Sequence, residues 1–275
     1  VYFSDGATPI GAGLTVRLLI NGASVTTATT DVNGAYTLWA NLTAGDALLA
    51  YIDNDPAYQG ATVTVSGSGS LTGINIYADH VIARHDNGGS LSNANMSTAK
   101  GAYVDTDIFY SVSGAALTVS GAVSELYIPA GHTFAPGGNV TTPDMTILGT
   151  LTGGSGTFTI TRNLLNTGSF TATSGTTTVT GNFDNSGTFT HSSGTVVLNG
   201  TYQSISGTTS VFNFTKAVTA ADTLTIAAGS ATTINGTATL NGASDQLLSL
   251  RSSTPGTRWN FVVNGGATKA ISYVS

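Results

Sequence analysis

The feature that most constrains the fold of this chain is a 19-residue unit that occurs three times in succession. The stretch NLLNTGSFTATSGTTTVTG (163–181) is followed at once by NFDNSGTFTHSSGTVVLNG (182–200), and DMTILGTLTGGSGTFTITR (144–162) aligns with both. A unit this short, with two or three short strands and glycine-containing corners, cannot bury its own apolar side chains. Neighbouring units must therefore stack and bury these side chains together.

The apolar positions of the three units coincide in four columns of the same parity, so all four can face inward. This pattern predicts a parallel β-helix (a β-solenoid) with about 19 residues per coil and coils about 4.8 Å apart. Each inward aliphatic or aromatic side chain contributes about 1.5–3 kcal/mol when buried. The stacking also predicts an amide ladder of Asn166 over Asn185. The inward columns are Met145, Leu164 and Phe183; Leu151, Phe170 and Phe189; Phe158, Thr177 and Val196; and Ile160, Val179 and Leu198.

The composition favours an all-β chain. Charged residues make up 8% of the sequence and glutamate occurs once, at Glu125, so long exposed helices rich in Glu, Lys and Arg are hard to place. Thr, Val, Ile, Tyr and Phe, interrupted by Gly and Asn, are typical of strands and turns. The absence of cysteine excludes disulfide bonds and thiolate metal sites.

Residues 1–78 follow a different pattern, in which apolar and polar residues alternate in short strands separated by turns such as Asn21-Gly22. Roughly seven such strands predict a β-sandwich. The stretch TTDVNGAYTL (29–38) resembles the strand-turn-strand signature of the carboxypeptidase-regulatory-like and Cna-B-like domains of bacterial surface proteins. The resemblance covers about residues 5–78 and implies an immunoglobulin-like or prealbumin-like sandwich.

The domain organisation follows from these two patterns. We expect a sandwich over residues 1–78, a connector over 79–110 and a parallel β-helix over 111–275. The repeat loosens after residue 200, but short strands broken by Gly or Asn continue to the last stretch of the chain. The chain begins and stops within strand-like sequence, which favours a mature fragment or one module of something longer.

Charge and hydropathy exclude two kinds of partner. The net charge is −6 and the eight basic residues are scattered singly from Arg17 to Lys269, whereas nucleic acid requires a basic stripe. The longest apolar runs, such as ALLAYI (47–52), are far short of a membrane span. We therefore expect neither nucleic-acid binding nor a membrane-spanning segment.

The sequence predicts no catalytic residue. It contains no nucleophile elbow, phosphate-binding loop or HExxH motif. Polysaccharide lyases and hydrolases with a β-helix fold need clustered acidic or basic residues on one face of the coils. The only charged residues of 144–200 are Asp144, Arg162 and Asp184. We expect a protein that is not an enzyme, with a β-helix polysaccharide lyase as the less favoured alternative.

Acidic pairs and histidines are the candidate metal ligands. Asp53 and Asp55 flank Asn54 before a proline and could offer oxygen ligands to Ca²⁺, although an Asx turn is the more common role. Asp105 and Asp107 share one face of a predicted strand, where carboxylates more often face solvent. The histidines are expected to be structural, because His80 and His85 have opposite parity and cannot bind one ion together. The other two, His132 and His191, lie at predicted corners.

Two tryptophans are candidates for sugar binding. Trp39 alternates with Leu38, so one of these two side chains faces outward, and Trp259 begins the last predicted coil. Amphipathic tryptophan more often packs at an interface between domains. An exposed tryptophan supports the alternative that the chain is an adhesin or carbohydrate-binding module with surface glycans as partners.

The two predicted parts together resemble modules of long, repetitive bacterial surface proteins, in which a small sandwich precedes a filamentous-haemagglutinin-like β-helix. The resemblance implies an extracellular structural protein at the cell surface, a subunit or module of a filament that copies of the chain form head to tail. Unpaired strand edges at the ends of a β-helix would provide the contacts. The candidate contact residues are Val1, Tyr2, Phe3, Ile271, Tyr273 and Val274.

Overall fold

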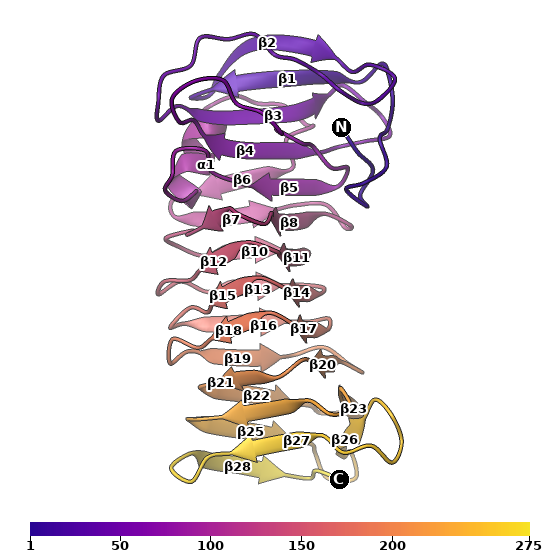
Figure 1. The fold of residues 1–275 in the computed structure, drawn as a ribbon. Coiled ribbons are helices and arrows are strands. Elements are labelled where there is room, and N and C mark those ends of the chain that lie inside the picture. The colour runs from indigo at the N-terminus through magenta and orange to yellow at the C-terminus, as the bar shows by residue number, and fades with distance from the viewer.

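Short strands in which threonine alternates with an aliphatic or aromatic residue build most of this molecule, because successive side chains point inward and outward. The computed structural model describes residues 1–275, and Figure 1 shows its coils stacked along one axis. The solenoid has about nine turns of about 20 residues. The prediction of a parallel β-helix is confirmed, and the chain is nearly all β, with one short helix where the sequence predicts an all-β chain.

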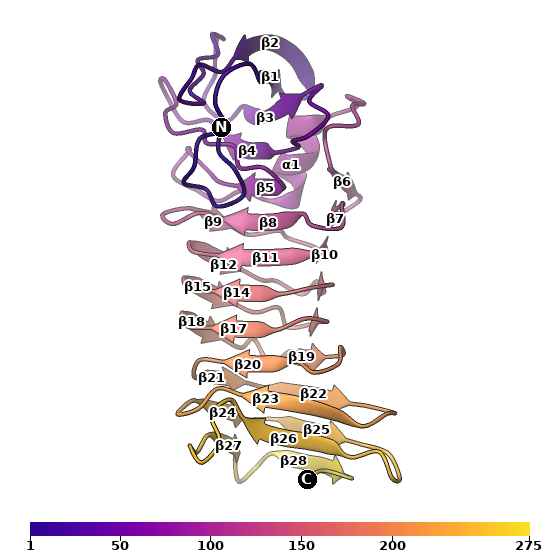
Figure 2. The same ribbon diagram turned by 90° about the vertical axis from the view of Figure 1, so that its right-hand side faces the viewer.

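Each coil contributes one short strand to each of three faces. The first face, in front in Figure 2, contains β8 (Glu125–Ile128), β11 (Asp144–Ile147), β14 (Leu164–Asn166), β17 (Phe183–Asn185), β20 (Ser204–Ser206), β23 (Asp222–Ile226) and β26 (Leu248–Ser252). The second contains β7 (Ala116–Val119), β10 (Val140–Thr142), β13 (Phe158–Ile160), β16 (Thr176–Val179), β19 (Thr195–Leu198), β22 (Asn213–Ala217), β25 (Thr237–Asn241) and β28 (Thr268–Ser272), with β6 (Tyr110–Ser113) antiparallel at one edge.

The third face is divided into two sheets, because β18 does not pair with the strand that follows it along the face. The four-stranded part contains β9 (Thr133–Phe134), β12 (Thr150–Thr152), β15 (Ser169–Thr171) and β18 (Thr188–Thr190). The three-stranded part contains β21 (Thr209–Val211), β24 (Ala231–Ile234) and β27 (Asn260–Val263). At this level of the solenoid, β17 and β20 pair through only two residues each.

The columns of the 19-residue repeat are parallel ladders in the structure. Met145 pairs with Leu164 and Leu164 with Phe183, and the other three columns align in the same way. All of these side chains are buried except Phe189, which is partly buried against the same core. The core is thus a continuous apolar interior that runs through successive coils.

Two contacts between stacked coils explain why the repeat has Asn and Gly at fixed positions. Asn166 lies over Asn185 inside the solenoid, and its Nδ2 donates to Asn185 Oδ1 at 2.6 Å. At the corner that follows, Gly168 lies between Gly149 and Gly187, and a Cβ on Gly168 would come within 2.2 Å of the Gly149 carbonyl oxygen. The corner therefore stacks closely only where a side chain is absent.

The coils lengthen toward the C-terminal end. Stacked residues are 19 apart at Leu164 and Phe183, but 24 apart at Phe214 and Ala238 and 31 apart at Ala238 and Lys269. The additional residues form the longer loops drawn at that end in Figure 1. The period of 19 therefore describes the central coils and not the whole solenoid.

The N-terminal region extends the first face of the solenoid. Four strands form an antiparallel sheet in the order β2, β1, β3, β4, and β4 then pairs in parallel with β5, which pairs with β8. One sheet of 12 strands therefore runs from β2 to β26. The strands are β1 (Thr15–Ile20), β2 (Ala23–Thr29), β3 (Ala47–Asp53), β4 (Ala61–Val65) and β5 (His80–Ala83).

The predicted N-terminal sandwich is not confirmed. A second sheet would require strands at AYTLWA (35–40) and LTGINIY (71–77), but neither stretch forms one of the strands. Both lie over one face of the antiparallel sheet, where Tyr36 and Ile74 pack against buried residues such as Val16. Alternation in the sequence identifies the inward side of these segments, but it does not provide the hydrogen-bonding partners that a sheet needs.

The helix α1 (Asn93–Lys100) packs against the other face of β3 and β4. Ser92 caps its first turn in a capping box with Asn95. Met96 and Ala99 are buried in the main core, so the helix covers the core at the N-terminal end of the solenoid. This helix lies within the predicted connector, and it is too short and too polar to cross a membrane.

Candidate functional site

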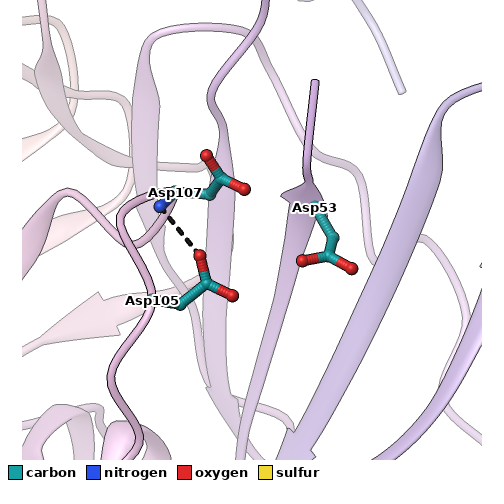
Figure 3. Close-up of side chains that lie close together, drawn as sticks. All are labelled: Asp53, Asp105 and Asp107. Atoms are coloured by element: carbon teal, nitrogen blue, oxygen red, sulfur yellow. Dashed lines mark hydrogen bonds between the residues drawn. The ribbon is translucent and has the colours of Figure 1, made fainter. Parts of the chain in front are cut away.

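Three carboxylates gather at the N-terminal end of the molecule (Figure 3). Asp53 is the last residue of β3, whereas Asp105 and Asp107 belong to the loop that connects α1 to β6. One oxygen of each carboxylate lies within 4.8 Å of one oxygen of each of the others. This acidic cluster (Asp53, Asp105 and Asp107) is the group of potential metal ligands that the fold brings together.

Hydrogen bonds hold the three carboxylates in different ways. Asp53 is 3% exposed, and its Oδ2 accepts from the Arg17 guanidinium at 2.7 and 3.1 Å. Asp105 accepts from the Tyr51 hydroxyl at 2.7 Å and from the backbone N–H of Asp107 at 3.0 Å. Asp107 accepts from the backbone N–H of Asn54 at 2.6 Å. The cluster therefore joins the end of β3 to the loop after α1.

Two pKa shifts follow from these contacts. The hydrogen bond to Asp53 raises the pKa of Arg17, so this guanidinium stays charged beside the cluster. Burial, together with the hydrogen bond to Asp105, raises the pKa of Tyr51 well above its usual value. Tyr51 is therefore a neutral donor to Asp105 and leaves the negative charge of the cluster unchanged.

Asp53 and Asp55, the pair that the sequence suggests for Ca²⁺, do not lie together in the acidic cluster. Asp55 closes its own turn, where its Oδ1 accepts from the backbone N–H groups of Ala57 and Tyr58, both at 2.9 Å. Asp53 instead meets Asp105 and Asp107, which come more than 50 residues later in the chain. No spacing in the sequence indicates this contact, because it depends on how the loop after α1 packs beside β3.

The histidines make structural contacts. His80 is buried between the Ala78 carbonyl at 2.6 Å and Glu125 at 3.1 Å. Burial alone would lower the pKa of His80, but the hydrogen bond and charge of Glu125 raise it above its usual value. The stability that this pair contributes is full below pH about 6.5 and is lost as the pH rises through the folded pKa.

The remaining histidines are held by backbone or amide groups. The rings of His85 and His132 meet edge to face with centroids 5.4 Å apart, and the Nδ1 atoms of both rings bond to backbone groups. Burial lowers the pKa of His132. His191 contacts the side-chain amide of Asn235 at 3.2 Å.

A groove lies beside Trp39 on the opposite face of the N-terminal sheet from α1. Its cavity of about 570 Å³ is lined by residues 33–40, Leu42 and residues 70–75 above a floor that includes Leu18, Leu48 and Ala50. The Trp39 side chain is 83% exposed at the rim. Trp259, the other candidate for sugar binding, is partly buried against the core of the solenoid.

The predicted contact residues lie at opposite ends of the molecule and differ in exposure. Val1 is buried and its amino group donates to the Gly34 carbonyl. Tyr2 forms bridges to Tyr77 and Pro9 within the N-terminal region, and Phe3 packs edge to face on Tyr58. At the other end, Ile271 is 47% and Tyr273 is 53% exposed, while Val274 is partly buried beside Leu248.

No family model, curated protein or solved structure matches this chain. Its function is therefore inferred from its own side chains and strand edges.

Proposed function

We propose that this chain is an extracellular structural protein, a stiff module of a bacterial cell-surface filament that assembles head to tail through strand edges. The observation that carries the proposal is the uninterrupted stacking of apolar columns through successive coils. Such stacking joins successive coils through strand pairs on two or three faces, so the solenoid resists bending. Under this proposal the chain is not an enzyme, and polymer cleavage by the purified chain would contradict it.

The two ends offer different contacts for assembly. At the N-terminal end, β2 pairs only with β1, and its outer edge is free. At the C-terminal end, β27 and β28 are the last strands of their sheets, and all five residues of β28 are exposed. A free edge pairs readily with another strand. A contact between unlike ends does not close on itself and therefore gives an open filament.

We expect the purified chain to form filaments longer than one molecule in negative-stain electron microscopy. Ile271→Lys should leave mainly single molecules, because it places a charge within the end contact. The control Thr159→Lys adds the same charge to an outward position of β13, on the side of the solenoid, and should leave the filaments intact. Filaments that persist after removal of residues 269–275 would contradict the contact through this edge, and single molecules at all concentrations would contradict assembly.

A further inference from the structure

The acidic cluster has the dimensions of a cation site. Two oxygens that bind one Ca²⁺ at about 2.3–2.6 Å are at most about 5 Å apart. The three carboxylates each place an oxygen within 4.8 Å of the others, as such a site requires. All of the candidate ligands are oxygens, which suits Ca²⁺ and disfavours metals that prefer nitrogen or sulfur.

A second observation points to a missing ligand. Oδ1 of Asp53 is buried and has no hydrogen-bond partner, while Oδ2 is occupied by Arg17. Figure 3 shows the two oxygens of Asp53 on opposite sides, one of them facing Asp105 and Asp107. A buried carboxylate oxygen without a partner is costly, so this atom is set to contact a cation between the three side chains.

The acidic cluster also carries a net negative charge. Arg17 forms the ion pair with Asp53, and neither Asp105 nor Asp107 forms a salt bridge. The remaining contacts come from neutral donors, the Tyr51 hydroxyl and the backbone N–H groups of Asn54 and Asp107. Three carboxylates against one guanidinium leave two negative charges, which a divalent ion balances.

We propose that Asp53, Asp105 and Asp107 bind Ca²⁺, with water completing the coordination from the open side of the loop. The ion would join the end of β3 to the loop after α1 and so hold the helix that covers the core. Calcium would stabilise the N-terminal end of the solenoid whether or not the chain assembles into filaments.

The test compares the full chain, freed of metal by chelation, with and without CaCl₂. We expect Ca²⁺ to raise the melting temperature, and Tb³⁺ to give luminescence that is sensitised by Tyr51 and displaced by Ca²⁺. Asp107→Asn should weaken Ca²⁺ binding about tenfold or more, because ligand charge sets the affinity of such sites. This variant keeps an oxygen that can accept from Asn54, so its metal-free melting temperature should not fall.

The matched control is Asp184→Asn, which removes a carboxylate on β17 in a distant coil. It should bind Ca²⁺ like the unchanged chain. The proposal is overturned if Ca²⁺ changes neither the melting temperature nor the Tb³⁺ signal, if both variants respond alike, or if Mg²⁺ at equal concentration gives an equal shift.

A different observation carries a second inference, about the groove beside Trp39. The backbone N–H and C=O groups of residues 36–42 form none of the 149 hydrogen bonds that join backbone groups in this chain. Their exposure nevertheless alternates residue by residue as in a strand, with Tyr36 and Leu38 packed inward and Trp39 pointing outward. This segment is strand-like in its side chains but has no pairing partner.

The groove offers free hydrogen-bonding groups along the backbone of residues 36–42, and its lining also includes the polar side chains of Asn33, Thr37 and Ser70. The Tyr36 hydroxyl already donates to the Ile74 carbonyl, and Thr62 Oγ1 to the Asn75 carbonyl. No charged side chain lines the cavity. A row of free backbone N–H and C=O groups is complementary to another extended peptide.

We infer that an extended, uncharged peptide segment of a partner chain docks in this groove as an added strand beside residues 36–42. The side chains at alternate positions of this peptide would pack on the floor formed by Leu18, Leu48 and Ala50. This inference is independent of assembly through the ends of the solenoid.

The probe is a fluorescein-labelled synthetic peptide of alternating threonine and valine. We expect saturable binding by fluorescence anisotropy and slower amide hydrogen exchange at 36–42. Trp39→Pro and Ala40→Pro each remove one N–H that has no internal partner. Successive N–H groups face opposite edges of a strand, so one proline should weaken binding about tenfold and the other should leave it nearly unchanged.

Trp39→Ala separates the peptide from a glycan, because it keeps the N–H and removes the indole. Peptide binding should survive this change within about threefold. Absence of saturable peptide binding, equal loss with both prolines, or glycan-array binding that Trp39→Ala abolishes would each overturn the inference.

Discussion

Asp222→Ala is expected to lower the free energy of unfolding by about 3–5 kcal/mol, because it leaves a buried ammonium group without its counterion. Lys216 on β22 is fully buried, and its Nζ lies 2.7 Å from Asp222 Oδ2 on β23. The same Nζ donates to the Gly200 carbonyl at 2.5 Å and to Gln203 at 2.9 Å. Chemical denaturation followed by circular dichroism measures the change.

The control is the double variant Lys216→Met/Asp222→Leu, which replaces the pair with apolar side chains and should restore stability to near that of the unchanged chain. A loss of less than about 1 kcal/mol in Asp222→Ala would contradict the prediction.

The same pair makes the fold sensitive to acid. Burial would raise the pKa of Asp222, but the hydrogen bonds from Lys216 and from the backbone of Tyr202 and Thr223 lower it. The stability from Asp222 is therefore full above its unfolded pKa of about 3.9 and is lost as the pH falls through the lower folded value.

Phe170→Ala is expected to lower the free energy of unfolding by about 3–5 kcal/mol, because it opens a cavity where successive coils pack on each other. Phe170 on β15 is fully buried between Phe158, with ring centroids 6.0 Å apart, and Phe189, at 5.2 Å. Denaturation curves of both proteins measure the loss. A loss below about 1 kcal/mol would show that this core is not closely packed.

Thr177→Val is a control in the same core, and we expect it to raise the free energy of unfolding instead of lowering it. Thr177 lies in the inward column between Phe158 and Val196, and its buried hydroxyl has no hydrogen-bond partner. Replacing this hydroxyl with a methyl group removes the desolvation cost, so stability should rise by about 1 kcal/mol.

The register of the central coils is predictable from the sequence because stacking repeats one environment every 19 residues. Leu164 must match Met145 and Phe183 if each coil is to bury the same positions, and the structure pairs these residues. Asn166 and Asn185 follow the same rule. Where the coils lengthen after residue 200, no fixed period remains, and only the strand-like alternation can be recognised.

The N-terminal region was less predictable because alternation fixes the buried side of a segment but not its partner strand. Residues 35–40 and 71–77 alternate like strands, yet they lie over the antiparallel sheet without forming one themselves. The helix α1 contains Asn and Ser and little that distinguishes it from a loop, and its burial depends on the core beneath it.

The acidic cluster and the buried lysine depend on contacts between distant segments. Asp53 meets Asp105 and Asp107 across a chain reversal that the sequence does not indicate. Lys216 is one of eight scattered basic residues, and nothing in its neighbourhood predicts that it lies in the core opposite Asp222.

The break in the third face between β18 and β21 has a mechanical consequence. Hydrogen bonds between coils lie along the axis, so a pull on the two ends of the molecule loads all bonds between neighbouring coils together. At this level the third face contributes no strand pairing, β17 and β20 pair through only two residues each, and β16 and β19 on the second face pair through four. This joint has the fewest paired residues of the joints between complete coils, so under tension we expect the coils from β19 to the C-terminal end to separate here as a unit.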